Sequence, residues 1–265
     1  MWNKQLASLY LRPEITLRFL LVLRRNLLVY SKFWRSSMMF NFIEPMLYLA
    51  ALGLGLGIYI PEIEGMSYLQ FIAPGLLASS TMWATSFECT YGSFIRLQVQ
   101  KSYHAIITTP VSLDEVVLGD IAFGVFKSIL YGSVILMVLF ILGLVTSPLA
   151  LLVPLVLFFS GLVFAQLSMI WTSLAPNFEI FAYYFTLFLT PMFLFSGIFF
   201  PLENLPLFAQ RLAWLTPLFH TVELCRGLVS GQMPSLYMAN LLSLFIFSLI
   251  LFLPPLLLMR RRLIQ

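Results

Sequence analysis

The sequence has few charged residues, two histidines and two cysteines. Aspartate, glutamate, lysine and arginine make up 10% of its 265 residues, against about 25% in an average soluble domain. So small a share of charge excludes an ordinary soluble domain, and a mean hydropathy of +0.95 indicates an integral membrane protein. Two cysteines are too few for a disulfide scaffold in a chain of this length, and they leave the redox compartment open.

Motifs of nucleotide and hydrolytic chemistry are also missing. No stretch matches the phosphate-binding loop G-x-x-x-x-G-K-[ST], and "GLGLG" at 53–57 follows no predicted strand, which excludes a dinucleotide-binding loop. Gly53 and Gly57 instead predict the close approach of another helix. No set of serine, histidine and acid indicates an intramembrane protease. The sequence therefore predicts no catalytic site, metal site or cofactor in this chain.

Windows with little or no charge predict six membrane-spanning helices. A bilayer core of about 30 Å requires roughly twenty apolar helical residues. The stretch 128–178 has no charged residue but is too long for one helix, and "GLVTSP" at 143–148 predicts the turn that divides it. We therefore expect a single all-α, polytopic membrane domain over residues 1–265. Its predicted spans lie at about 36–60, 68–91, 116–142, 148–174, 180–200 and 237–259.

Lysine and arginine predict which side of the membrane each loop faces. They gather before the first span, after the second span and in the C-terminal tail, so the positive-inside rule places both termini in the cytoplasm. The net charge of +4 then reports orientation rather than nucleic acid binding. His104 and His220 fall on opposite sides, as do Cys89 and Cys225, which excludes a disulfide or a multi-ligand metal site within one chain. A ligand pair of His220 and Cys225 is the alternative.

The segment before the first span predicts an amphipathic helix at 14–35, lying in the cytoplasmic membrane interface. Charged residues recur at four- and seven-residue spacing from Glu14 to Lys32, while apolar residues such as Phe19 point away from them. The apolar stretch is too short for a secretory signal, and no small-residue cleavage site follows it. A loosely held positive tail is the alternative.

The connection between the last two spans predicts a re-entrant helical hairpin at 201–227 on the outer side. Two prolines divide this apolar stretch into halves of about ten residues, each half a bilayer long at about 1.5 Å per residue. Broken helices are tolerated at membrane depth only where protein or a water-filled cavity covers them, so the hairpin is expected to gate a pathway. A helix pair lying on the outer leaflet is the alternative. The candidate gate residues are Pro201, Glu203, Pro206, Pro217, His220, Glu223 and Arg226.

The third predicted span carries Asp120 near its start, and three further charged side chains lie inside predicted spans, in their cytoplasmic half: Glu44, Glu88 and Lys127. An unpaired charge at mid-bilayer costs about 2.5 to 3.5 kcal/mol, so we expect all three to face the helix bundle. Lys127 is expected to pair with Glu44 or Glu88. Two interpretations follow: a salt-bridged brace between the first three spans, or a role in admitting a polar substrate head group.

The cytoplasmic loop after the second span predicts a short helix, a stop and a second helix. The pattern over about 94–108 favours an amphipathic helix, and Pro110 ends it because proline disfavours helix at the preceding residue. "SLDE" at 112–115 predicts a capping box that starts the third span. This arrangement is typical of a docking surface for a cytoplasmic partner, and a solvated loop is the alternative. The candidate coupling residues are Arg96, Gln100, Lys101, Tyr103, His104 and Ile106.

Three stretches carry a family resemblance: "EPMLYLAALGLGLG" at 44–57, the segment opening "YLQFIAPGLL" at 68–120, and the segment opening "SGIFFPLENL" at 196–231. They resemble the permease subunits of type 2 ABC exporters. Within that family they look most like the nodulation-type branch associated with lipo-oligosaccharide export. The resemblance covers nearly the whole chain in order.

The resemblance implies a homodimer of six-span subunits in a bacterial cytoplasmic (inner) membrane. It also implies two copies of a separately encoded ATP-binding subunit, which would hold the ATP and Mg²⁺. The interface helix and the coupling helix would receive the ATPase motion, and the hairpin would gate the outer end of an alternating-access path. Aromatic side chains that could line this path, or could merely pack or meet lipid, are Tyr48, Trp83, Phe87, Phe188, Phe193, Phe195 and Phe199.

The substrate stays open, because relatives of this type carry glycolipids, polysaccharides or hydrophobic drugs. A membrane channel or a lipid-modifying enzyme is the rival class. A channel would be expected to show a repeated pore motif, and an enzyme a cluster of acids or histidines at one depth. Neither pattern is evident in the sequence.

Overall fold

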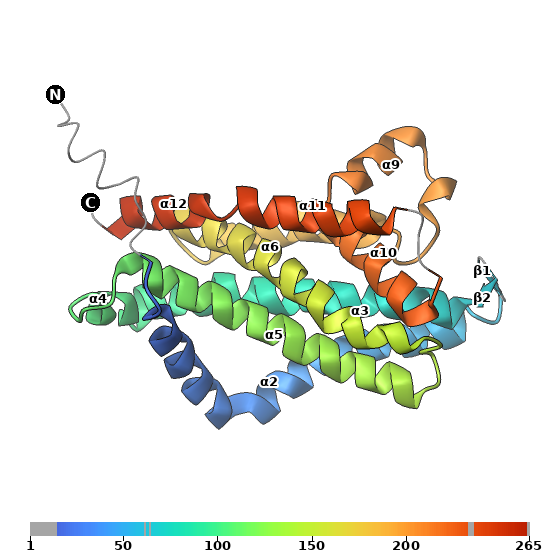
Figure 1. The fold of residues 1–265 in the computed structure, drawn as a ribbon, viewed down its shortest axis with the longest axis horizontal. Helices are drawn as coiled ribbons and strands as arrows, with labels where there is room; N and C mark the ends of the chain where they lie inside the picture. The colour runs from blue at the N-terminus through green and yellow to red at the C-terminus, as the bar shows by residue number, and fades with distance from the viewer. Residues whose placement is uncertain (1–14, 61, 64, 233–235, 264–265) are drawn as a thin grey trace.

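Helices that run roughly along one long axis make up the molecule, as a computed structural model shows (Figure 1). The structure describes residues 15–60, 62–63, 65–232 and 236–263. At the centre lie α3 (Tyr68–Phe87), α5 (Leu113–Ile141) and α6 (Val153–Leu174), each packed against the other two. The fold is that of an all-α membrane protein, to which a two-stranded hairpin of β1 (Glu62–Ile63) and β2 (Met66–Ser67) is added.

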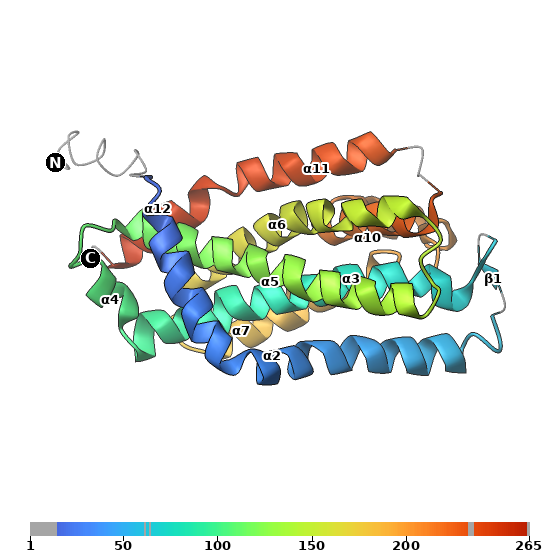
Figure 2. The ribbon, with the colours of Figure 1, turned by 60° about the horizontal axis from the view of Figure 1, so that its bottom comes forward.

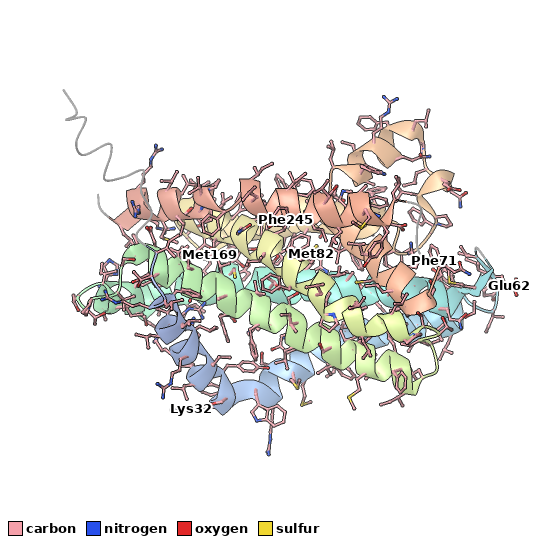
Figure 3. All side chains as sticks on the ribbon, viewed as in Figure 1. Lys32, Glu62, Phe71, Met82, Met169 and Phe245 are labelled. Atoms are coloured by element: carbon pink, nitrogen blue, oxygen red, sulfur yellow. The ribbon has the colours of Figure 1, made fainter. Side chains whose placement is uncertain are left out.

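Helix α2 (Phe19–Gly55) covers both the predicted interface helix and most of the predicted first span. No glycine or proline interrupts the sequence from Phe19 to Glu44, so nothing ends the helix between the two. The helix changes direction instead, as Figure 2 shows, and Lys32 lies near the bend in Figure 3. Glu14, where the predicted interface helix begins, lies outside the described residues.

Four stretches of helix among the described residues are long and apolar enough to cross a membrane: Phe19–Gly55, Leu113–Ile141, Pro148–Leu174 and Tyr237–Leu263. The last of these divides into α11 (Tyr237–Ile250) and α12 (Leu253–Leu263), because Pro254 and Pro255 cannot continue the hydrogen bonding of α11. Helix α3 has enough residues, but serines and threonines lower its hydropathy.

The region of the predicted fifth span is short and irregular. It runs from α7 (Glu179–Tyr183) through the π-helical η4 (Tyr184–Leu189) to α8 (Thr190–Phe195). Four of the six predicted spans therefore have the length and apolarity of a membrane helix in the described part of the chain, and the arrangement of six remains a proposal.

The segment after α3 differs from the predicted coupling helix at 94–108. The π-helical turns η1 (Glu88–Gly92) and η2 (Ile95–Val99) extend α3 beyond its predicted end. The chain then turns at Lys101, which has a left-handed φ of 51°, and a separate helix α4 (Ser102–Ile106) follows. The expected single helix is thus two pieces joined at a tight turn.

Helix α5 begins with the capping box that "SLDE" predicts. The Ser112 hydroxyl accepts a hydrogen bond from the Glu115 backbone N–H at 3.3 Å, and the Glu115 carboxylate accepts one from the Ser112 N–H at 2.7 Å. Gly119, in the second turn, lets α2 cross close by, because a Cβ atom there would lie 2.5 Å from the Cβ of Val22. The capped start of α5 and the first half of α2 are therefore in direct contact.

The two ends of the bundle carry different elements. The start of α2, α4 and the end of α12 lie at one end, and the β-hairpin and α9 (Leu207–Trp214) lie at the other (Figures 1 and 2). We call them the α4 end and the β end. The α4 end therefore carries Lys101, just before α4, together with the arginines at the start of α2 and at the end of α12, as the charge distribution predicts for a shared side.

The predicted hairpin at 201–227 consists of η5 (Leu202–Asn204), α9 and the longer α10 (Pro217–Ser230). Thr216 caps α10, Pro217 occupies its first position, and Gly231 ends it with a left-handed φ of 77°. Helix α9 projects from the bundle, whereas α10 is largely buried against α3 and α6 (Figure 1). The two halves are thus unequal in length and in burial.

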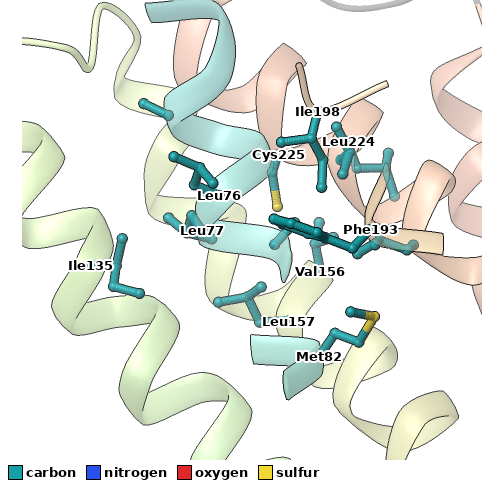
Figure 4. Packing of buried hydrophobic residues seen from close by; sticks show 14 of the residues in the cluster. Leu76, Leu77, Met82, Ile135, Val156, Leu157, Phe193, Ile198, Leu224 and Cys225 are labelled. Carbon is teal, nitrogen blue, oxygen red and sulfur yellow. The ribbon is translucent and has the colours of Figure 1, made fainter. Parts of the chain in front are cut away.

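The apolar core fills the space where α3, α5, α6 and α10 meet the end of α8 (Figure 4). Leu77, Ile135 and Leu157 are nearly inaccessible to solvent and lie on three of these helices. Close packing of this kind is what holds membrane helices together, since lipid is as apolar as their side chains.

Candidate functional site

Asp120, on α5, is a buried carboxylate at the centre of a polar cluster near the α4 end. Its Oδ2 accepts hydrogen bonds from Ser93 Oγ at 2.8 Å and Tyr103 OH at 2.6 Å, and lies 3.1 Å from Arg96 Nε. Its Oδ1 accepts a hydrogen bond from Asn26 Nδ2 at 2.7 Å. One carboxylate thus joins α2, the turns after α3, α4 and α5.

A second carboxylate, Glu88, extends this cluster toward the middle of the bundle. Its Oε1 lies 2.6 Å from Arg96 Nη1, and its Oε2 lies 2.5 Å from Lys127 Nζ. The Lys127 ammonium also lies 5.4 Å from the ring centre of Tyr30. Of the two partners expected for Lys127, the structure places Glu88 beside it and not Glu44.

These side chains form one network, which we call the Asp120 cluster: Asn26, Glu88, Ser93, Arg96, Tyr103, Asp120 and Lys127. Its two carboxylates and two cations balance, so it carries no net charge. Burying charges is costly unless each is paired and hydrogen-bonded, and here every charged group has at least one partner of opposite sign.

Burial and charge set the protonation of the two groups that come from the loop. Burial, and then the charge of Asp120, raises the pKa of the Tyr103 phenol well above 10.0, so the phenol stays protonated and donates its hydrogen bond. For Arg96, burial lowers the pKa, but the charges of Asp120 and Glu88 outweigh it and raise the pKa overall. The guanidinium therefore stays charged.

The start of α2 is also fastened to the α4 end by polar contacts. The Thr16 backbone N–H donates to Glu115 Oε1 at 3.1 Å, and Arg25 Nη2 donates to Ser102 Oγ at 2.9 Å. The Arg18 guanidinium donates to the carbonyl oxygen of Pro110. These contacts join α4 and the turn before α5 to the start of α2.

The candidate coupling residues divide into two groups. Arg96 and Tyr103 belong to the Asp120 cluster. Gln100, Lys101 and His104 are exposed around the left-handed turn, and Ile106 is half-buried at the end of α4. The exposed group is the part of this segment that another protein could touch.

The C-terminal helix is anchored to the same end. Arg260 Nε donates to Asp114 Oδ1 at 2.7 Å, which connects α12 to the first turn of α5. The Arg262 guanidinium lies 5.3 Å from the ring centre of Phe94 and donates to the carbonyl oxygen of Thr172. Two of the tail arginines thus have a structural role, in addition to the orientation that they predict.

Glu44 is placed differently from the other two intramembrane charges. Glu44 is exposed on α2 and has no hydrogen-bond or ion-pair partner in the described part of the protein. It lies in a groove between α2, α3 and α8, which we call the Glu44 groove. Its lining residues are Asn41, Glu44, Pro45, Tyr48, Leu76, Ser79, Ser80, Trp83, Phe87 and Phe193.

Five of the seven candidate path aromatics are connected ring to ring along this groove. The Trp83 ring lies 6.4 Å from Phe87 and 6.3 Å from Phe193, measured between ring centres. Phe193 also contacts Tyr48 at 5.8 Å and Phe199 at 5.1 Å. The other two lie apart from this row.

Phe188 and Phe195 are these other two. Phe188 packs edge-on against Trp171 at 5.7 Å, on another side of the segment, and its side chain is half exposed. Phe195 is exposed at the end of α8, and no ring contact joins it to the described aromatics. The structure therefore does not bring either residue into the Glu44 groove.

The gate candidates on α10 hold the helical hairpin at 201–227 to the bundle. Arg226 Nη1 lies 2.8 Å from Glu223 Oε1, and Arg226 Nη2 donates to the carbonyl oxygen of Gly197 at 2.5 Å. The guanidinium stacks over the ring of Phe71, 3.9 Å from its centre. Arg226 thus fastens α10 to the start of α3 and to the loop after α8.

His220 is buried, and both of its ring nitrogens are engaged. Nε2 lies 2.9 Å from the Trp214 carbonyl oxygen, and Nδ1 lies 2.8 Å from Asn240 Oδ1. Both ring nitrogens of His220 are thus taken up by hydrogen bonds that join α10 to the end of α9 and to α11. Of the remaining gate candidates, Pro206 precedes α9, Pro217 begins α10, and Pro201 and Glu203 lie at η5.

Comparison with known proteins shows the family to which this chain is similar. Residues 18–230 match the model of the ABC-2 type transporter family. The chain is 38% identical to nodulation protein J of Rhizobium leguminosarum bv. viciae, over 96% of this chain and 98% of the relative. It is 34% identical to nodulation protein J of Sinorhizobium fredii over the full length of both chains.

A more distant relative comes from outside these bacteria. The inner membrane transport permease YadH of Escherichia coli is 24% identical over 73% of this chain and 75% of the relative. The family match covers all of the bundle from the start of α2 to the end of α10. The chain therefore belongs to the ABC-2 type transporter family, as a membrane permease of the nodulation protein J type.

Proposed function

We propose that this chain is the membrane subunit of an ATP-driven exporter for an amphipathic, lipid-linked saccharide. Two copies would form the path, and two copies of a separate ATP-binding subunit would hold ATP and Mg²⁺ and hydrolyse the nucleotide. The membrane would be the bacterial cytoplasmic membrane. Family membership and the names of the relatives from Rhizobium, Sinorhizobium and Escherichia coli support this proposal.

The proposed topology has six spans with both termini in the cytoplasm. The spans would be the second half of α2, α3, α5, α6, the run from α7 to α8, and the pair α11 and α12. The gathering of basic side chains at the α4 end supports a cytoplasmic α4 end by the positive-inside rule. The β-hairpin and α9 would then face the outer side.

The Asp120 cluster is the observation that carries the proposed mechanism. Closure of the ATP-binding subunits would push the exposed turn formed by Gln100, Lys101 and His104. Tyr103 and Arg96, on either side of this turn, both reach Asp120, so the push arrives at α5 and, through Asn26, at α2. This chain has no phosphate-binding loop of its own, so ATP would bind to the other subunit. The motion of that subunit would then have to reach the membrane helices through a rigid connection of this kind.

The consequence of this motion would appear in the Glu44 groove. The groove is bounded by α2, α3 and α8, and α2 is the helix whose first half the α4 end moves. Rotation or sliding of α2 would therefore open or close the groove, and α10, fastened by Arg226, would form its outer boundary. Alternating access follows from this coupling of one end of α2 to the other.

Charge reversal on the exposed turn tests the proposed function. The double substitution Lys101→Glu with His104→Glu is expected to abolish co-purification of the ATP-binding subunit and the ATPase activity of the complex. Arg211→Glu, a charge reversal on α9 at the β end, is the matched control and is expected to retain both. Export that continues without an ATP-binding subunit would contradict the proposal.

A further inference from the structure

A hollow distinct from the Glu44 groove opens between α2 and α5. It has a volume of about 210 Å³ and is lined by Met38, Met39, Asn41, Phe42, Tyr131, Val134 and Ile135. Met39 is 63% exposed, so the hollow is open to the surroundings of the protein. An apolar cavity of about 150 Å³ stays dry and takes up apolar molecules. This larger hollow therefore has room for a hydrocarbon ligand.

The hollow follows the bend of α2 along the chain. Lys32 lies near the bend (Figure 3), and Trp34, two residues later, is 45% exposed. Tryptophan is enriched where a membrane meets water. Met38 and Phe42 follow Trp34 by four and eight residues, which is about 6 and 12 Å along a helix. The bend is thus placed at the depth of lipid head groups, and the hollow at the depth of acyl chains.

Two basic side chains lead to the hollow along α2. Lys32 and Arg35 lie three residues apart, and Met39 follows Arg35 by four, so the three share one stripe of the helix. Lys32 and Arg35 are exposed, and neither has a carboxylate partner in the described part of the chain. Arg35 lies 5.7 Å from the ring centre of its neighbour Trp34. The stripe thus passes from positive charge to apolar lining.

No carboxylate competes for these two cations. Between positions 19 and 43, α2 holds four basic side chains and no acid. Glu44 stands nine residues after Arg35, which at 3.6 residues per turn puts it on the opposite side of the helix. Glu88 is neutralised by two cations of the Asp120 cluster. An anionic group beside Lys32 and Arg35 would therefore meet positive charge alone.

Hydroxyl groups lie at the end of the hollow nearer the α4 end, since Ser37 and Tyr131 precede the apolar lining on their two helices. Tyr131 OH lies 2.6 Å from Ser37 Oγ and accepts a hydrogen bond from Tyr30 OH at 3.3 Å. These two contacts use two of the three hydroxyl hydrogens. The third can be donated to an acceptor, and the ester oxygens that join an acyl chain to glycerol are acceptors.

A phospholipid with a negatively charged head group has the matching parts in the same order. Its phosphate would lie beside Lys32 and Arg35, its ester oxygens at the hydroxyls, and one acyl chain between Met38 and Val134. We propose that the bend of α2 and the facing part of α5 form a site for one anionic phospholipid. This lipid is not the exported substrate, and the proposal does not depend on the proposed export function.

Photoreactive lipids test the proposal. Phosphatidylglycerol and phosphatidylcholine, each with a diazirine at the same position of the acyl chain, are compared in nanodiscs that hold the full-length chain. Adducts are mapped by mass spectrometry. Each lysine or arginine near an anionic lipid surface strengthens binding by about fivefold, so we expect about twentyfold more adduct from phosphatidylglycerol on the segments 38–42 and 131–135.

Removing the two charges tests the head-group half of the site. Lys32→Gln with Arg35→Gln is expected to bring the labelling by the two lipids to within about twofold of each other. Arg211→Gln with Arg261→Gln removes the same charge from two exposed positions outside the site, and should retain the preference. A preference that the Lys32 and Arg35 substitutions leave unchanged would overturn the proposal.

Filling the hollow tests the acyl-chain half. Val134→Phe is expected to reduce the adducts of both lipids on the two segments several-fold, whereas Met137→Phe, at a position of α5 that is 64% exposed, should leave them unchanged. Equal labelling of the wild type by the two lipids would overturn the proposal, because the hollow would then not select charge. So would the absence of adducts from both lipids, since a second copy of the chain would then cover the hollow.

Discussion

Single residues set the strength of the connection at the α4 end, and Asp120 has the central place. It is 1% exposed and has four side-chain partners: Asn26 on α2, Ser93 between η1 and η2, Arg96 on η2, and Tyr103 on α4. Removing one member of a buried ion pair leaves an uncompensated charge, at a cost of about 3 to 5 kcal/mol. The cluster should therefore be sensitive to changes that preserve volume and alter only charge.

Asp120→Asn is the first such change. We expect it to lower the free energy of unfolding by about 3 kcal/mol, because Arg96 keeps only Glu88 as a counter-charge. Equilibrium unfolding by SDS in mixed micelles measures the difference. Glu179→Gln, at an exposed carboxylate, is the control and should leave the transition in place. An equal transition for both variants would contradict the buried-pair account.

A double-mutant cycle isolates the pair of Glu88 and Lys127. Each of Glu88→Gln and Lys127→Met should destabilise the protein, and the double variant should lose less than the sum. The expected interaction energy is about 1 to 3 kcal/mol, the range for contacting residues in one network. Additive effects would show that the two groups do not interact in the folded protein, and would rule out the brace.

Sequence reasoning found only part of this cluster. Glu88 and Lys127 were foreseeable as partners, because a charge inside a span needs a counter-charge and few are available. Asn26 and Asp120 were not, because 94 positions separate them and nothing in either local pattern points to the other. Asp120 stands near the start of the predicted third span, and its charge at that position was the signal that could have pointed to it.

At the scale of elements, the close crossing of α2 over α5 depends on the absence of a side chain at Gly119. Gly119→Ala places a Cβ 2.5 Å from Val22 and 3.0 Å from the Phe19 carbonyl oxygen, so the helices must separate. We expect a loss of about 1 to 3 kcal/mol, as for other overpacked sites. Gly55→Ala, where nothing lies within 4 Å of the new Cβ, is the control. Equal stability of the two variants would contradict the close crossing.

Elements were predictable where local chemistry determines them. The capping box before α5 and the start of α10 at Pro217 follow from side chains within a few residues. The break at Lys101 does not, because lysine rarely adopts a left-handed φ and no glycine marks the turn. The sequence did not predict the exposure of Glu44 either, because that exposure depends on which helices cover α2.

For the whole molecule, the proposed orientation in the membrane rests on the position of the basic side chains. Arg211→Cys on α9 and His104→Cys on α4 place single exposed thiols at opposite ends of the bundle. A membrane-impermeant maleimide added to spheroplasts should label the first and not the second, and both after lysis. Cys89 and Cys225 are buried and should give little background. Labelling of His104→Cys alone in intact spheroplasts would contradict the proposed orientation and indicate the opposite one.

The central claim is that ATP-driven motion enters at α4 and reaches α2 and α5 through Asp120. Tyr103→Phe tests it most directly, since it removes one hydroxyl, 2.6 Å from Asp120, and keeps the ring. The measurement is the number of substrate molecules exported per ATP hydrolysed, in proteoliposomes that contain the complete complex. We predict that Tyr103→Phe still binds the ATP-binding subunit but exports markedly less substrate per ATP. An unchanged ratio would contradict transmission through the Asp120 cluster.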